Sequence, residues 1–337
     1  MHSRTKVDLG RPDLETVVRE VVGSASPVEH VRELTDGMFN AAYAVRTADG
    51  REMVVKVAPP VGTPVLSYEH DLMRAEADFF HRASGVIPVP AVLGVDLTRT
   101  RLDRDVLVLE HLRGRPLAAA RRGMPAADRA AVERDLGALV ARLRAVTGTR
   151  FGYDRPDGAL SGATWTEALA AMVAALLADA DRYGVRLPAR VGALPERVRA
   201  AEPELSAVRV PVLTHFDLWA GNVFVVPGEH GHRLEAVVDG ERAFWGDPLA
   251  ELASTALFRD PARATDFLAG FAETAGSPLD LGPGAQLRLA LYRAYLYLIM
   301  TVEGAPRGYR GAEARLLGAY ARHRLAREVR VLDRALH

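Results

Sequence analysis

Residues 214–225 read THFDLWAGNVFV and place a carboxylate and an amide five positions apart, at Asp217 and Asn222. Apolar residues continue to position 226, and a second apolar run follows at 234–238. Two such runs separated by a turn that contains Pro and Gly predict paired strands. We therefore expect the polar side chains of this stretch to lie at the end of a two-stranded hairpin.

The residue after the second run is Asp239, seventeen positions beyond Asn222. Phosphoryl transfer needs one carboxylate at the acceptor hydroxyl and separate oxygen ligands that hold magnesium on the nucleotide phosphates. An Asp followed by an Asn at a distance of five is the spacing of a kinase catalytic loop. Asp and Asn are also common in ordinary turns, but the complete ordered set favours the catalytic interpretation.

This set, together with Gly246-Asp247-Pro248 further along, resembles the aminoglycoside phosphotransferase family, small-molecule kinases related in fold to the protein kinases. The resemblance implies an α+β, two-lobed protein-kinase-like fold, with a small β-rich N-lobe and a larger, mainly helical C-lobe. It implies ATP and Mg²⁺ as cofactors. By position in the motif, Asp217 is the catalytic carboxylate, and Asn222 and Asp239 are the metal ligands.

The resemblance extends to a nucleotide loop upstream. Residues 34–40 read LTDGMFN and precede strand-like segments at 42–45 and 52–57. Gly37 allows the backbone to approach phosphate closely, and exposed N–H groups can bind anionic oxygens. With a single glycine the motif is weak, and an ordinary hairpin turn explains it equally well.

Lys56 strengthens the nucleotide-site interpretation. The chain has 43 Lys plus Arg, and only Lys6 and Lys56 are lysines. In a chain so rich in arginine, a lysine within an apolar strand indicates a site for a compact charge in place of a guanidinium fork. The matching family residue pairs with the ATP phosphates. The alternative is a strand lysine whose head group reaches solvent.

A glutamate on the next helix normally holds that lysine in the family. Glu69 and Glu76 are the candidates, and we favour Glu76 because of its distance from Pro88-Val89-Pro90. The two glutamates are seven residues apart, so on one helix they would share a face, and Glu69 stays open.

Residues 105–117 form an apolar run that ends in a turn containing Gly and Pro, and this pattern resembles the hinge between the lobes. There, the backbone near Glu110 and Leu112 would bind the adenine edge. The expected division is a nucleotide-binding lobe at 1–109, a hinge at 110–116 and a catalytic and acceptor-binding lobe at 117–337.

Helical patterns support this division. We expect a leading helix at 12–22, mostly strands up to the hinge, and then mostly helices, among them 129–145 and 166–183. In the family, the second of these regions helps to form the acceptor pocket. Asp247 is expected to cap a following helix or to bond the catalytic loop, and we favour this structural role over a catalytic one.

Composition is consistent with a globular enzyme. The 337 residues are 49% hydrophobic and 26% charged, with a formal net charge of zero, which argues against a nucleic-acid or membrane-surface protein. The chain has no cysteine, and its first residues lack a signal-peptide apolar region. We expect a cytoplasmic protein; the oligomeric state is left open.

Two positions depart from the family pattern. Phe216 stands where relatives usually carry Gly, which leaves the loop conformation uncertain, and Gly240 stands where protein kinases have Phe. His215 is expected to fix the loop by hydrogen bonding.

Charge gives the only indication of the acceptor. Residues 211–303 carry 12 Asp plus Glu against 6 Arg, which suits a cationic acceptor such as an aminosugar or a basic peptide antibiotic. A solvated acidic surface is an equally simple explanation. The candidate acceptor contacts are Glu241, Glu251, Asp260 and Glu303.

The expected activity is ATP-dependent transfer of the γ-phosphoryl group to a hydroxyl of a small, cationic molecule. A metabolic kinase of choline, homoserine, a methylthio-sugar or a glycated amine is the main alternative, and a nucleotide-binding pseudokinase is another. Whether the role is antibiotic resistance or metabolism stays open.

Overall fold

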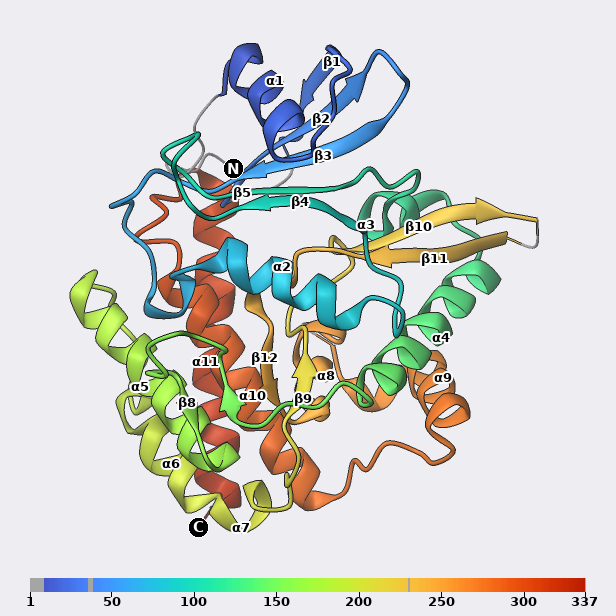
Figure 1. Cartoon of the computed structure of the whole chain (residues 1–337). Helices are drawn as coiled ribbons and strands as arrows, with labels where there is room; N and C mark the ends of the chain where they lie inside the picture. The colour runs from blue at the N-terminus through green and yellow to red at the C-terminus, as the bar shows by residue number, and fades with distance from the viewer. Residues whose placement is uncertain (1–8, 36–38, 230, 258, 337) are drawn as a thin grey trace.

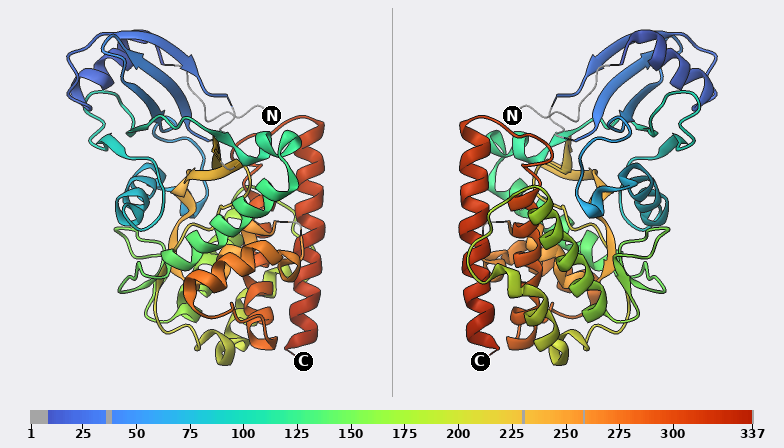
Figure 2. Two further views of the ribbon diagram at one scale, coloured as in Figure 1. Left: turned by 90° about the vertical axis from the view of Figure 1, so that its right-hand side faces the viewer. Right: turned by 90° about the vertical axis from the view of Figure 1, so that its left-hand side faces the viewer.

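The computed structural model describes residues 9–35, 39–229, 231–257 and 259–336. An antiparallel sheet lies above a larger, mainly helical part, and the C-terminal helix, Ala312–Ala335, runs down one side of the molecule (Figures 1 and 2). We call the elements from α1 to β5 the N-lobe and those from β6 onward the C-lobe. This arrangement confirms the predicted two-lobed α+β fold.

The N-lobe sheet has five strands in the order β1-β2-β3-β5-β4, each antiparallel to its neighbours. The third strand coincides with the predicted segment 52–57. The strands are β1 (Val28–Glu33), β2 (Ala41–Thr47), β3 (Glu52–Val57), β4 (Val92–Asp96) and β5 (Val106–Glu110).

One helix packs on each face of this sheet, and the alternation of β5 shows why. Val106 and Val108 belong to a small core with α1 (Arg11–Glu20), the predicted leading helix. Leu107 and Leu109 point the other way, into the main core with α2 (Leu72–Ala83). The main core continues from α2 through the C-lobe, so α2 lies at the junction of the two lobes.

Helices form most of the C-lobe, and α4 and α5 match the predicted segments 129–145 and 166–183 closely. None of the described helices is long and apolar enough to cross a membrane. The helices are α3 (Leu117–Ala120), α4 (Ala126–Leu143), α5 (Trp165–Arg182), α6 (Leu194–Ala200), α7 (Glu202–Leu205), α8 (Glu251–Thr255), α9 (Thr265–Ala275), α10 (Pro283–Val302) and α11 (Ala312–Ala335).

Short strands position the polar loops of the C-lobe. β10 and β11 pair as the predicted hairpin, and β10 also pairs with β6. β12 lies between β7 and β9, so the segments that leave β9 and β11 are held close together. The strands are β6 (Arg115–Pro116), β7 (Phe151–Gly152), β8 (Ser161–Gly162), β9 (Val212–Thr214), β10 (Val223–Gly228), β11 (Gly231–Val237) and β12 (Phe244–Gly246).

The connection between β3 and α2 binds to the C-lobe. The backbone N–H and the hydroxyl of Ser67 donate to the buried carboxylate of Asp179 on α5, at 2.6 and 2.8 Å. The hydroxyl of Tyr183 donates to the carbonyl of Val65 at 2.7 Å. These bonds attach the segment that precedes α2 to the C-lobe.

Candidate active site

The ammonium group of Lys56, on β3, faces two carboxylates from distant parts of the chain. Its Nζ lies 2.8 and 2.6 Å from the two carboxylate oxygens of Glu76 on α2. It also lies 2.6 Å from Oδ1 of Asp239, which follows β11. Lys56 therefore holds one carboxylate of each lobe.

These ion pairs keep Lys56 and Asp239 charged. Burial by itself would lower the pKa of Lys56, but the carboxylates of Asp239 and Glu76 outweigh it and raise the pKa above its usual value. For Asp239, burial acts to raise the pKa, and the ion pair with Lys56 outweighs it and lowers the pKa. A fixed cation and a fixed anion therefore lie side by side.

Glu69, the other candidate partner of Lys56, is used elsewhere. It ends a short 3₁₀ helix (Ser67–Glu69), and α2 begins only at Leu72, after Asp71 with a left-handed φ of 61°. The expectation that both glutamates would share a face of one helix is wrong, because the left-handed residue breaks the helix between them. The carboxylate of Glu69 pairs with Arg307.

The loop of residues 215–222, here called the catalytic loop, is anchored through its backbone. The buried carboxylate of Glu251 accepts the N–H groups of His215 and Phe216 at 2.5 and 3.1 Å. The hydroxyl of Ser254 accepts the N–H of Leu218 at 3.0 Å. Glu251 and Ser254 both belong to α8, so one short helix fixes the loop.

His215 fixes the loop from the inside, as expected. Its Nδ1 accepts the N–H of Asp217 at 3.2 Å, which leaves Nε2–H to donate to the carbonyl of Val238 at 2.9 Å. Burial lowers the pKa of His215 to about 4. The ring is therefore neutral and links the catalytic loop to the end of β11.

Phe216 adopts the left-handed backbone conformation that the usual glycine would adopt freely, with φ at 61°. Its ring is fully buried and packs against Phe244 and Tyr295, with ring centroids 4.9 and 5.7 Å apart. A left-handed non-glycine residue costs on the order of 1 kcal/mol or more, and burial of the aromatic ring offsets this cost.

The carboxylate of Asp217 has two protein partners. Its Oδ2 accepts a hydrogen bond from Nδ2 of Asn222 at 3.2 Å, and its Oδ1 lies 3.4 Å from Nη1 of Arg242. Burial raises the pKa of Asp217 above its usual value. Because Asn222 also donates to the carbonyl of Asp217, its amide oxygen is left for another ligand.

The residue after Asp239 must be small. A Cβ built on Gly240 would lie 2.4 Å from the ring of Phe79, which projects from α2. The α2 side chain thus occupies the space that a phenylalanine after the aspartate would need, which accounts for the departure from the protein-kinase pattern.

The predicted hinge follows β5, and a distant glutamate holds it. The N–H of Glu110 donates to the carbonyl of Ala91 at 2.8 Å, while Leu112 is only partly buried. The carboxylate of Glu235 on β11 accepts the N–H groups of Arg113 and Gly114 at 3.0 and 2.8 Å. No pattern in the sequence indicates this role for Glu235.

Gly37 lies outside the described residues. The end of its loop is described, and there Nδ2 of Asn40 donates to Oε2 of Glu241 at 3.3 Å. The loop thus reaches the C-lobe beside Asp239.

Of the four candidate acceptor contacts, Glu241 lies at the site. Burial, and then the charge of Asp239, raise the pKa of Glu241 to about 8. Glu303 is paired with two arginines, and Glu251 holds the catalytic loop. Asp260 caps a short helical turn by accepting the N–H of Ala262.

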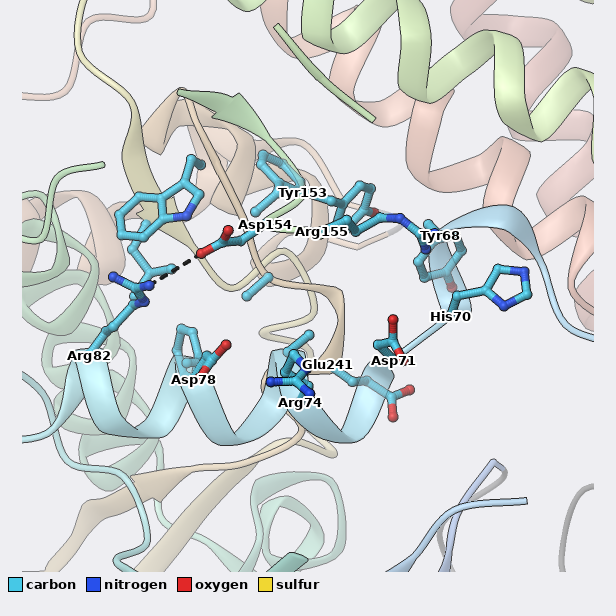
Figure 3. Close-up of a pocket in the computed structure, with 16 residues that line it drawn as sticks. Tyr68, His70, Asp71, Arg74, Asp78, Arg82, Tyr153, Asp154, Arg155 and Glu241 are labelled. Atoms are coloured by element: carbon cyan, nitrogen blue, oxygen red, sulfur yellow. Dashed lines mark hydrogen bonds and ion pairs between the residues drawn. The ribbon is translucent and has the colours of Figure 1, made fainter. Parts of the chain in front are cut away.

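Glu241 also lines a pocket between α2 and the β7–β8 region. Figure 3 shows Arg74 and Asp78 of α2 on one side of this pocket and Tyr153 on the other. Arg82 and Asp154 form an ion pair at 3.2 Å across it.

The catalytic loop carries an exposed indole. Trp219 is 44% exposed and lies over Gly221, where a Cβ would come within 2.2 Å of its ring. The glycine lets the loop turn beneath the indole.

Asp247 has the structural role predicted for it. Its Oδ1 accepts the N–H of Leu249 at 3.0 Å and caps the following turn. Its Oδ2 accepts bonds from Arg288 and Tyr292 of α10.

The donor groups are suited to magnesium only in combination with a nucleotide. No three His, Cys, Asp or Glu side chains in the described ranges form a group that could hold a metal by themselves. However, Asp239, which its ion pair with Lys56 keeps charged, and the amide oxygen of Asn222 are oxygen donors of the kind that magnesium accepts. Magnesium is commonly bound by one or two carboxylates plus substrate phosphates.

The comparison with protein families gives one result over most of the chain. A sequence profile of the phosphotransferase enzyme family (APH) matches residues 30–289. No curated protein is significantly similar in sequence.

Solved structures with the same fold cover nearly the whole chain. A candidate fructosamine-3-kinase from Thermobifida fusca is 26% identical, with a TM-score of 0.67, over 95% of this chain and 98% of its own. A candidate aminoglycoside phosphotransferase from Ralstonia eutropha is 15% identical, with a TM-score of 0.65, over 97% and 99%. A thermostable mutant of aminoglycoside phosphotransferase APH(4)-Ia, in a ternary complex with AMP-PNP and hygromycin B, is 20% identical, with a TM-score of 0.64, over 94% and 98%.

Proposed function

The chain belongs to the phosphotransferase enzyme family, and we propose that it transfers the γ-phosphoryl group of ATP to a hydroxyl of a small, cationic acceptor such as an aminoglycoside. One observation carries the proposal. Lys56, Glu76 and Asp239 meet through direct ion pairs, and Asp217 and Asn222 of the catalytic loop are hydrogen-bonded to each other beside them.

The residues take the following roles in this proposal. Asp217 orients the acceptor hydroxyl and accepts its proton, a task that its raised pKa favours. Lys56 binds the α- and β-phosphates, and Glu76 holds Lys56 in position. Asn222 and Asp239 would hold magnesium, which neutralises the charge that develops on the phosphates during transfer.

The lobes divide the work accordingly. Residues 1–109 would bind the nucleotide, residues 110–116 would form the hinge with the adenine at the backbone of Glu110 and Leu112, and residues 117–337 would supply catalysis and the acceptor pocket. The loop around Gly37 would cover the phosphates.

Support for a cationic acceptor comes from Glu241, because a nearby cation would favour the charged form of a carboxyl group whose pKa is raised to about 8. Among the four acidic residues considered as acceptor contacts, only Glu241 lies beside Lys56 and Asp239. The excess of acidic residues at 211–303 carries less weight, since Glu251 and Glu303 are engaged in bonds within the protein.

A glycated amine is the second candidate acceptor. The similarity to the Thermobifida fusca protein favours it, because that protein's name places it among the fructosamine-3-kinases. Such an acceptor also carries an amine beside sugar hydroxyls, so both candidates could place a cation beside Asp239 and Glu241.

The test is ADP release by the purified protein with ATP and magnesium. The acceptor panel should contain aminoglycosides, basic peptide antibiotics, macrolides, a glycated lysine, choline and homoserine, with the Asp217→Asn variant as the control. Turnover with one class that the variant lacks would support the proposal and identify the acceptor. Nucleotide binding without ADP release on any acceptor would favour a pseudokinase.

A further inference from the structure

Resting on the proposed function, we propose that Arg307 is a positioning residue that ties the nucleotide loop and the segment before α2 to the catalytic carboxylate. Arg307 lies in the connection between α10 and α11 and is 3% exposed. It belongs to the C-lobe, but two of its contacts are with the N-lobe. None of the motif residues identified from the sequence performs this task.

The guanidinium of Arg307 has partners from both lobes. Nη2 donates to Oε1 of Glu69, in the connection that leads into α2. The Cζ atom lies 4.8 Å from the ring centroid of Phe39, at the end of the nucleotide loop. On the C-lobe side, Nη1 lies 2.9 Å from the hydroxyl of Tyr309 and 3.4 Å from Oε2 of Glu303.

The contacts continue from Glu303 to the catalytic loop. The same oxygen of Glu303 lies 2.8 Å from Nη2 of Arg242. Nη1 of Arg242 lies 3.4 Å from Oδ1 of Asp217. Carboxylates and guanidinium groups thus alternate without a break from the N-lobe to the catalytic carboxylate. We call this series the charge chain, and its members in order are Glu69, Arg307, Glu303, Arg242 and Asp217.

Stability alone does not explain the charge chain. Taking five charged groups out of water is costly, and apolar residues of similar volume often stabilise a core as well or better. Within the described residues, the Nε atoms of Arg242 and Arg307 are buried without a hydrogen-bond partner, and such a group costs about 1–3 kcal/mol. The charge chain instead fixes the relative positions of Glu69 and Arg307, which are 238 positions apart in the sequence.

The consequence is that the nucleotide loop and the catalytic carboxylate share one support. Asn40, the residue after Phe39, also bonds to Glu241 beside Asp239. If the charge chain is broken at Arg307, the end of the nucleotide loop at Phe39 and the segment before α2 are no longer held against the C-lobe. The affinity for nucleotide should then fall although Arg307 is not among the proposed nucleotide ligands.

The experiment measures AMP-PNP binding in the presence of magnesium and without acceptor, by isothermal titration calorimetry. Arg307→Met should weaken binding about tenfold, within the range of typical coupling energies between sites. Arg307→Lys, which keeps the charge but not the planar contact with Phe39, should recover part of the loss. Phe39→Leu leaves every ion pair in place and should give a smaller loss in a protein that folds normally.

Arg324→Met is the matched control. Arg324 is also a buried arginine, with its Cζ 5.3 Å from the ring of Tyr297 and an acidic partner, Glu328, at 3.8 Å. Those partners lie on α10 and α11, remote from the N-lobe elements. The control should lower the melting temperature to a similar extent and leave the affinity for AMP-PNP within twofold.

The outcomes separate the two proposals. Wild-type affinity in Arg307→Met and Phe39→Leu, or an equal loss in Arg324→Met, would overturn the role of Arg307. Once an acceptor is known, a rise in KM for the acceptor alone would make Arg307 an acceptor ligand and would also overturn it. Failure of the wild-type protein to bind AMP-PNP would instead refute the proposed function.

Discussion

The catalytic loop and the ammonium group of Lys56 are held in place by different interactions. The backbone N–H groups of the loop donate hydrogen bonds to Glu251 and Ser254, all within the C-lobe. Lys56 is fixed by side-chain ion pairs, one of which crosses between the lobes. The position of the loop backbone is therefore set within the C-lobe, whereas the position of Lys56 relative to Asp239 depends on how the two lobes are placed.

The largest expected effect comes from removing the carboxylate of Asp217, which we propose to be catalytic, while the ion pairs of Lys56 stay intact. Asp217→Asn should lower kcat by about 10²–10⁴-fold, the usual contribution of a positioned acid or base. The amide still accepts a bond from Asn222, so AMP-PNP affinity should stay near that of the wild type. Steady-state kinetics and calorimetry check the two parts, and a variant with wild-type kcat would refute the role of Asp217.

The next largest effect comes from removing the ion pair between the lobes, which joins Lys56 to Asp239. Lys56→Met leaves the buried carboxylate of Glu76 without its cation, close to the half-exposed Asp239, and should lower the free energy of unfolding by about 3–5 kcal/mol. AMP-PNP affinity should fall as well. Lys56→Arg should not restore it, because a broad guanidinium does not fit where a compact ammonium is held by two carboxylates at 2.6 Å.

These Lys56 effects are measured by urea unfolding and calorimetry. A Lys56→Arg protein with wild-type affinity and stability would show that only the charge matters at this position.

A third substitution disturbs the backbone anchor of the catalytic loop. In Glu251→Gln the side chain keeps one acceptor oxygen for the two N–H groups of His215 and Phe216. One buried donor then loses its partner, which should lower the free energy of unfolding by about 3 kcal/mol. Because this anchor lies within the C-lobe, kcat should fall while AMP-PNP affinity stays unchanged. A comparable loss of AMP-PNP affinity would show that the two sides of the site are not independent.

The smallest expected effect is a pH dependence of the free energy of unfolding, which arises from His215 in the same loop. Its pKa falls from 6.5 to about 4 on folding, so the unfolded chain takes up a proton that the folded protein excludes. Stability is therefore complete above pH 6.5 and is lost progressively as pH falls toward 4. Between pH 6.5 and 5 the loss should reach about 2 kcal/mol, at 1.36 kcal/mol per unit.

The control for the pH effect is His215→Gln, which lacks the titrating ring. The difference in unfolding free energy between the wild type and this variant should shrink as pH falls through that window. A difference that stays constant with pH would contradict the buried, neutral state of His215, with Asp239 and Arg242 as the nearby charges.

The sequence predicted those parts of the molecule that are encoded locally. The β10–β11 hairpin, the strand that carries Lys56 and the helices α4 and α5 follow from periodicity and turn residues within short windows. The spacing of Asp217 and Asn222 is local too, because one loop must supply both groups. These features needed no knowledge of tertiary contacts.

The sequence could not predict pairs whose meaning arises only in the folded chain. Glu69 and Arg307 are 238 positions apart, and nothing near either residue indicates the other. For the same reason, the count of acidic residues could not show which carboxylates are paired within the protein, as Glu303 is with Arg242 and Arg307. The left-handed Asp71, which separates Glu69 from α2, likewise has no sequence signal.

The exposed indole of Trp219 on the catalytic loop allows ligand binding to be followed by the intrinsic fluorescence of the protein. The chain has three tryptophans, and Trp165 and Trp245 are 1% and 7% exposed, against 44% for Trp219. A collisional quencher such as acrylamide therefore addresses mainly the indole two residues from Asp217. Protection of this emission by an added compound would reveal acceptor binding without a label and without turnover.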